Sequence, residues 1–147
     1  VLAGGSRLRD PWAAGDRREV TRVGVGAVMP EVLAAADELT AGGVAVEVLC
    51  LTSPNLIFRA LRARDGLGKE STAILEDLFP ERTTAPIVTV VDGHPHALAF
   101  LAAVRPCRST ALGVDGFGQS GDLEDLYRHH GIDADTIAGA AAELAAR

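Results

Sequence analysis

The chain has 147 residues, of which 48% are hydrophobic and 4% aromatic, and its formal net charge is −6. This length fits a single folded domain, and the aliphatic composition excludes a disordered chain. The acidic balance argues against a nucleic-acid partner, which requires a clustered basic surface. No apolar run approaches the roughly 20 residues of a membrane span, and the opening VLAGGSRLRD lacks the pattern of a signal peptide.

Segments rich in β-branched and other aliphatic residues predict strands at 6–10, 19–27, 44–52, 86–93 and 109–115. Helical spacing of apolar residues, or a Ser, Asp or Pro at a helix start, predicts helices at 30–41, 55–64, 72–79, 95–104, 123–130 and 133–147. The segment 10–18, with Pro11 and Gly15, predicts a loop. This alternation is typical of an α/β fold, in which a mostly parallel sheet is covered by helices on both faces.

Polar residues and glycines mark the ends of several predicted helices. Side chains that can accept hydrogen bonds predict N-caps at Ser53, at Asp122 with Asp125 as a capping box, and at Asp133 or Asp135. Gly131 predicts a helix end. His129 and His130 fall in the turn before it, where a positive charge suits the helix dipole.

The first candidate site lies in VGVGAVMPE (23–31), where two glycines join a strand to a helix. Gly24 and Gly26 resemble the start of a dinucleotide-binding fingerprint, but its third glycine would fall at Met29. The following strand ends in CLTS, without an acid to hold a ribose. A tight strand-to-helix turn is therefore favoured, and a weak anion site formed by Gly26, Ala27, Val28 and Met29 stays open.

The second candidate site is the polar cluster of DGHPHALAF (92–100), at the carboxyl end of the clearest buried strand. Ligands of open α/β sheets bind at such strand ends, so Asp92, Gly93, His94 and His96 are candidate binding residues. A zinc site would need a third or fourth protein ligand, which no obvious spacing supplies. A histidine that caps the helix or faces a partner is the favoured alternative.

The other polar residues offer weaker candidates. Arg59, Arg62 and Arg64 share one helix and could hold an anion, although a solvated face is the more common role of such a group. Ser120 lacks the spacing of a nucleophile elbow. The sequence thus predicts neither a catalytic nor a metal-binding constellation.

The two cysteines indicate the redox compartment, and the first residue bears on whether the chain is part of a larger protein. Cys50 lies in an apolar run and Cys107 in a polar loop, without CxxC spacing. They predict two free thiols in a reducing cytoplasm, with a disulfide or metal role as the alternative. The chain begins without Met, so residues 1–147 are expected to be one domain of a larger polypeptide.

Segments along the whole chain share a pattern with one family. They are GGSRLRD, then VTRVGVGAVMPEVLAAADELTAGGVAVEVLCLTSPNLIF, AILEDLFPER and GVDGFGQSGDLEDLYRHHGIDADTIAGAAAELA. With them the chain resembles the C-terminal domain of transketolase and its relatives. LTSPNLIFRALRARDG and the signature Asp115, Gly116, Phe117, Gly118 and Ser120 are similar to homodimeric pyruvate dehydrogenase, the thiamine-dependent decarboxylating component.

This resemblance implies a three-layer α/β/α fold with a five-stranded sheet of order 1-3-2-4-5, whose first strand is antiparallel. It also implies a homodimeric enzyme in which preceding domains bind thiamine diphosphate and magnesium. Their Gly-Asp-Gly…Asn pattern does not occur in this chain. No catalytic residue and no cofactor is therefore expected within the chain itself.

The first functional hypothesis is an assembly domain of a thiamine-dependent pyruvate dehydrogenase, in contact with upstream domains, a second subunit and an acyltransferase component. Phe117 would plug the carboxyl edge of the sheet, and Gly116 and Gly118 would permit backbone geometry that a side chain blocks. One alternative is the same domain of a transketolase. The other is a small-ligand or anion-binding module, with the turns at 26–29 and 92–96 facing each other.

Overall fold

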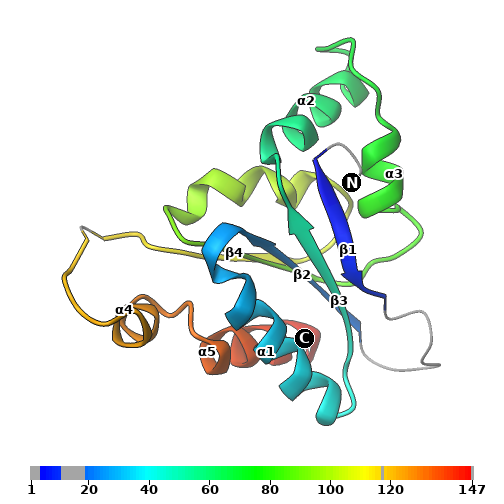
Figure 1. Cartoon of the computed structure of the whole chain (residues 1–147). Helices are drawn as coiled ribbons and strands as arrows, with labels where there is room; N and C mark the ends of the chain where they lie inside the picture. Colours follow the sequence, from blue (N-terminus) through cyan, green and yellow to red (C-terminus); the bar gives the residue numbers. More distant parts are fainter. Residues whose placement is uncertain (1–3, 11–18, 117, 147) are drawn as a thin grey trace.

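A central sheet separates two helical layers in the computed structural model, which describes residues 4–10, 19–116 and 118–146 (Figure 1). The strands are β1 (Gly5–Arg9), β2 (Glu19–Val25), β3 (Ala45–Leu51), β4 (Ile87–Val91) and β5 (Ser109–Leu112). Their order is β1-β3-β2-β4-β5; β1 runs antiparallel to β3 and the other pairs are parallel. The predicted fold class and strand order are confirmed. The loop predicted at 10–18 lies, from residue 11 onward, outside the described residues.

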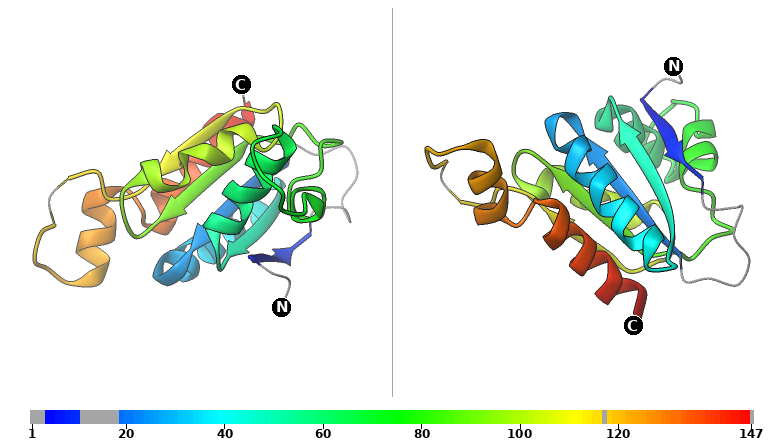
Figure 2. Two further views of the ribbon diagram at one scale, coloured as in Figure 1. Left: turned by 90° about the horizontal axis from the view of Figure 1, so that it is seen from above. Right: turned by 60° about the horizontal axis from the view of Figure 1, so that its bottom comes forward.

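The helices are η2 (Gly26–Val28), α1 (Met29–Ala41), α2 (Pro54–Arg64), α3 (Ala73–Leu78), η3 (Pro95–Ala103), α4 (Leu123–His130) and α5 (Ala134–Ala146). Helices α1 and α5 cover one face of the sheet, and α2, α3 and η3 cover the other (Figure 1). Helix α4 stands beyond the sheet, at the edge where β2, β4 and β5 end (Figure 2). We call that edge the carboxyl edge, and the opposite one, where these strands begin, the amino edge.

Both faces of the parallel strands are buried, which explains their nearly continuous apolar runs. In β2, Val20 packs with the α1 and α5 layer, whereas Val23 packs with the α2, α3 and η3 layer. Both side chains are at most 1% exposed. Full burial of such a side chain contributes about 1.5–3 kcal/mol. The aliphatic composition thus supplies two separate cores, one on each side of the sheet.

The helix predicted at 95–104 is a 3-10 helix, η3, rather than an α-helix. Its nine residues cover about 18 Å as a 3-10 helix, compared with about 14 Å as an α-helix. Strand β4, with five residues, is about 16 Å long. The stretched helix therefore returns the chain along the whole of β4 to the amino edge, where β5 begins.

The predicted helix ends are correct in part. Gly131 ends α4 in the left-handed conformation, at φ 64°, as predicted. The capping box is wrong, because the Asp122 side chain makes no cap hydrogen bond and Asp125 instead pairs with Arg128. Ser53 likewise precedes α2 without a side-chain cap. A short polar side chain before a helix is therefore not sufficient for a cap.

Asp133 caps α5, the last helix. Its Oδ1 accepts a hydrogen bond from the Thr136 backbone N–H at 3.1 Å, and its Oδ2 accepts one from the Thr136 hydroxyl at 2.6 Å. Burial acts to raise the pKa of Asp133, but these bonds outweigh it and lower the pKa below its usual value.

Replacing Asp133 with alanine is expected to lower the free energy of unfolding by about 0.5–2 kcal/mol. Asp133→Asn is the matched control, because asparagine caps helices nearly as well without a charge. Folding lowers the pKa of Asp133, so its negative charge stabilises the folded chain above the unfolded pKa. This stabilisation is lost as the pH falls through the folded pKa. Urea unfolding between pH 2 and pH 6 measures both effects; equal stability of Asp133→Ala and the parent chain would contradict the cap.

Candidate functional site

The turn at the end of β2 is packed by its own side chains. A Cβ atom on Gly24 would lie 2.4 Å from the Met29 sulfur, so the methionine occupies the space in which a pyrophosphate would approach. Val28 is fully buried, whereas Gly26 and Ala27 are exposed. Gly26 has a φ of +73°, which favours glycine. The prediction of a tight strand-to-helix turn is confirmed, and Val28 belongs to the core rather than to a binding surface.

The polar cluster after β4 lies at the same edge, because β2 and β4 are neighbours in the sheet. Asp92, His94 and His96 are all exposed. His94 precedes η3, and its Nδ1 accepts a hydrogen bond from the His96 backbone N–H at 3.2 Å. The expectation that a histidine caps this helix is confirmed. Gly93 instead serves the fold, since its carbonyl accepts a hydrogen bond from Val114 N–H at 2.8 Å.

Tyr127 and Glu31, which the periodicity could not place, lie near Asp92 or near each other at this edge. The Tyr127 side chain, from α4, is 6% exposed. Burial raises its pKa, and the negative charges of Asp92 and Glu31 raise it further. Glu31 also accepts a hydrogen bond from Ala134 N–H at 2.9 Å, which ties the starts of α1 and α5 together. Since two carboxylates face this edge, the local charge disfavours an anion there, and the anion site at the two turns stays a prediction.

The glycine-rich signature forms the exposed connection between β5 and α4. Asp115, Gly116, Gly118 and Ser120 are exposed, whereas Phe117, expected to plug the sheet edge, lies outside the described residues. A Cβ on Gly116 or on Gly118 would meet no described atom within 4 Å, so the described residues give no packing reason for these two glycines.

The glycine that packing requires in this segment is Gly113, just ahead of the signature. A Cβ there would lie 2.4 Å from the Gly93 carbonyl oxygen. Gly113 therefore lets the segment after β5 cross close to the turn after β4.

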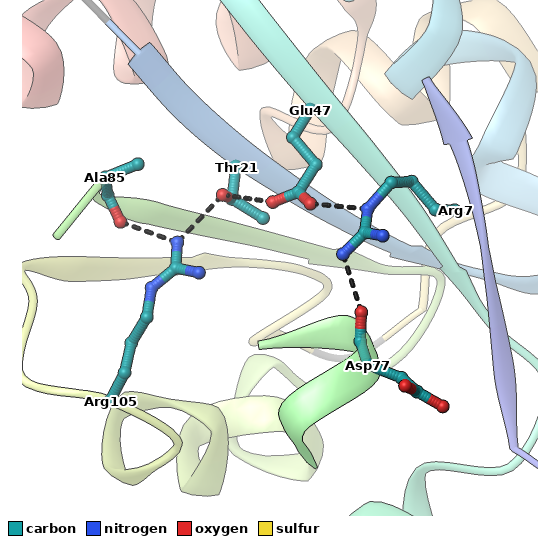
Figure 3. A network of polar contacts seen from close by, with 6 residues as sticks. All are labelled: Arg7, Thr21, Glu47, Asp77, Ala85 and Arg105. Atoms are coloured by element: carbon teal, nitrogen blue, oxygen red, sulfur yellow. Dashed lines mark hydrogen bonds and ion pairs between the residues drawn. The ribbon is translucent and has the colours of Figure 1, made fainter. Parts of the chain in front are cut away.

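At the amino edge, a buried polar network joins three strands, and the sequence pattern gave no sign of it (Figure 3). The Glu47 carboxylate, on β3, accepts hydrogen bonds from Arg7 Nε of β1 and from the Thr21 hydroxyl of β2, both at 2.7 Å. Arg105 Nη2 donates to the Thr21 hydroxyl oxygen and to the Ala85 carbonyl, both at 2.8 Å. Contacts between residues as far apart as Thr21 and Arg105 depend on the strand order, which local periodicity does not contain.

The arginines of α2 do not converge on a common point. Arg59 pairs with Glu70, in the loop that follows α2. Arg64 donates to the carbonyl oxygens of Val104 at 2.8 Å and Ala103 at 2.6 Å, so it fastens η3 to α2. Arg62 is exposed. The helix is a structural and solvated surface, and the alternative of a shared anion site has no geometric support.

Within the part of the chain that the structure describes, no three His, Cys, Asp or Glu residues are placed to hold a metal ion. No catalytic step is assigned to the described residues. Cys50 and Cys107 are free thiols. A search of the same residues finds no helix with the length and apolarity needed to cross a membrane.

Residues 7–133 match the family described as transketolase-like TK C-terminal domain. Transketolase 10 of Craterostigma plantagineum is 29% identical to this chain over 144 residues, which are 98% of the chain and 19% of that protein. The structure of transketolase from Leishmania mexicana superposes with a TM-score of 0.68 at 19% identity, covering 98% of this chain and 18% of that one. A split-gene transketolase, named as an inactive beta4 tetramer, gives 0.71 at 21% identity, over 97% of this chain and 42% of that one.

These similarities agree with the sheet order that the sequence resemblance predicted. The chain spans 19%, about a fifth, of the length of the Craterostigma transketolase. The relatives named above are transketolases, so the narrower resemblance to pyruvate dehydrogenase is not supported by them. The family match extends over most of the described residues, and the chain belongs to the transketolase C-terminal domain family.

Proposed function

We propose that this chain is the assembly domain of a thiamine diphosphate-dependent enzyme of the transketolase type. Other parts of the enzyme would bind the cofactor and transform the substrate, and this domain would support them in a homodimer. The observation that carries the proposal is the family match over residues 7–133. The split-gene transketolase adds support. This domain covers 42% of that chain, which is named as an inactive beta4 tetramer.

A second candidate is the same domain in a homodimeric pyruvate dehydrogenase. It is favoured by the signature from Asp115 to Ser120 and by the segment 51–66. In that enzyme the domain would support oxidative decarboxylation of pyruvate, and an acyltransferase component would be an additional partner. The transketolase proposal is stronger because the relatives that match the chain are transketolases. A cytoplasmic location belongs to both proposals and is supported by the two free thiols.

The test is an activity assay on the isolated chain and on the complete polypeptide that carries it. With thiamine diphosphate, magnesium, xylulose 5-phosphate and an aldose phosphate acceptor, we expect ketol transfer by the complete polypeptide and none by the isolated chain. Decarboxylation of pyruvate by the complete polypeptide, without ketol transfer, would favour the second candidate.

A further inference from the structure

A groove of about 420 Å³ opens at the amino edge of the sheet. Glu19, Arg82, the segment 83–86 and Arg108 line it. Backbone hydrogen bonds hold its walls together: Thr21 N–H donates to the Pro86 carbonyl and Ile87 N–H to the Arg108 carbonyl, both at 2.9 Å. We call it the amino-edge groove. It lies at the opposite edge from the turns after β2 and β4.

Two arginines, Arg82 and Arg108, line this groove in a protein whose net charge is −6. Arg108 is exposed, and it forms no ion pair with another residue that the structure describes. Glu19 is the acidic residue of the lining.

A buried network that itself holds more positive than negative charge lies directly behind the groove. Glu47 supplies the carboxylate of the network. The Arg7 guanidinium donates to it directly, and the Arg105 guanidinium reaches it through the Thr21 hydroxyl. Two positive charges therefore face one negative charge. Arg105 is 2% exposed, and its Nε and Nη1 have no hydrogen-bond partner among the described residues.

The field of this buried charge reaches the groove through a short path. Arg105 Nη2 donates to the carbonyl of Ala85, and Ala85 lines the groove. A charge in a low-dielectric interior is weakly screened, and a concave wall focuses its field into the nearest solvent. Any neutralising anion is therefore most favoured in front of the Ala85 wall.

We propose that the amino-edge groove binds a phosphate group, either inorganic or carried on a small molecule. The Arg108 guanidinium would hold two phosphate oxygens, a geometry that arginine forms readily. Thr84 lies in the same lining and carries a hydroxyl that can donate a hydrogen bond to a phosphate oxygen. The proposal is independent of the assembly role, because it rests on charges within this chain alone.

The test titrates the ¹⁵N-labelled chain with potassium phosphate and, separately, with glycerol 3-phosphate, at an ionic strength held constant with potassium chloride. We expect saturable chemical-shift changes at the amides of Thr84, Ala85 and Arg108. Equal affinity for the two ligands assigns the groove to free phosphate, and tighter binding of the ester assigns it to a carried phosphate. Changes that are linear with concentration, or that centre on Gly26 and Asp92, would overturn the proposal.

Arg108→Gln is expected to weaken binding about tenfold or more, because a charge-assisted hydrogen bond is lost. Arg62→Gln is the matched control, since Arg62 is an exposed arginine on α2, outside the groove lining. It removes the same charge and should leave the affinity unchanged. Both positions are exposed, so both variants should fold, which thermal unfolding verifies. An equal loss of affinity in the two variants would show only a general charge effect and would overturn the site.

Discussion

Replacing Glu47 with glutamine is expected to lower the free energy of unfolding by about 3–5 kcal/mol, because it removes the negative partner of a buried charge cluster. The Glu47 side chain is 6% exposed and accepts hydrogen bonds from both Arg7 and Thr21. Glutamine has nearly the same shape but no charge. The guanidinium of Arg105 would then remain at 2% exposure without a compensating carboxylate. Chemical denaturation measures the loss.

Glu76→Gln is the matched control for this change, since Glu76 is an exposed glutamate on α3. A surface substitution of this kind should change stability by no more than about 0.5 kcal/mol. A double variant, Glu47→Gln with Arg105→Met, should lose less than the sum of the two single variants, because it also removes the stranded cation. An effect of Glu47→Gln no larger than that of Glu76→Gln would show that the network does not stabilise the fold.

Replacing Arg22 with methionine is expected to raise the free energy of unfolding by about 1–4 kcal/mol. Arg22 lies in β2 at 0% exposure, and Nε, Nη1 and Nη2 have no hydrogen-bond partner among the described residues. Burial lowers its pKa to about 10, against the attraction of Glu38 and with the repulsion of Arg9. Methionine keeps a long side chain of similar length in the core and removes the charge.

The lowered pKa of Arg22 also makes the free energy of unfolding depend on pH. Because folding lowers the pKa of Arg22 to about 10, the unfolded chain binds more protons in the window between the folded and the unfolded pKa. Stability should therefore rise with pH through that window in the parent chain, relative to Arg22→Met. Arg62→Met, on the exposed face of α2, is the control and should leave stability nearly unchanged. A destabilised Arg22→Met would mean that the arginine has a partner that compensates its burial.

The strands and most helices followed from local patterns, because apolar period and helix-ending glycines act over a few residues. The strand order did not follow from them and was available through the family resemblance. The same limit applies to Glu47 and Arg22, which interrupt apolar runs and give no local sign of where their charges go. Packing also explains why two positions are glycine. Gly24 leaves room for the Met29 sulfur, and Gly113 leaves room for the Gly93 carbonyl oxygen.

In the candidate sites, too, position was predictable from the sequence, whereas the contacts that depend on tertiary packing were not. The residues at the ends of β2 and β4 were correctly placed at one edge, because parallel neighbouring strands end together. Their chemical setting was not predictable, since it depends on Tyr127 of α4, which lies near both Asp92 and Glu31 of α1. The amino-edge groove was missed because Arg82 and Arg108 are brought together only by the pairing of β4 with β5.

We propose that this domain assembles a thiamine-dependent enzyme of the transketolase type and does not catalyse its reaction. The most direct measurement is ketol transfer by three preparations: the complete polypeptide, the polypeptide without residues 1–147, and that truncated form mixed with the isolated chain. We expect truncation to impair turnover and dimer formation, addition of the isolated chain to restore them in part, and the isolated chain alone to be inactive. Full activity and unchanged assembly of the truncated polypeptide, or ketol transfer by the isolated chain, would contradict it.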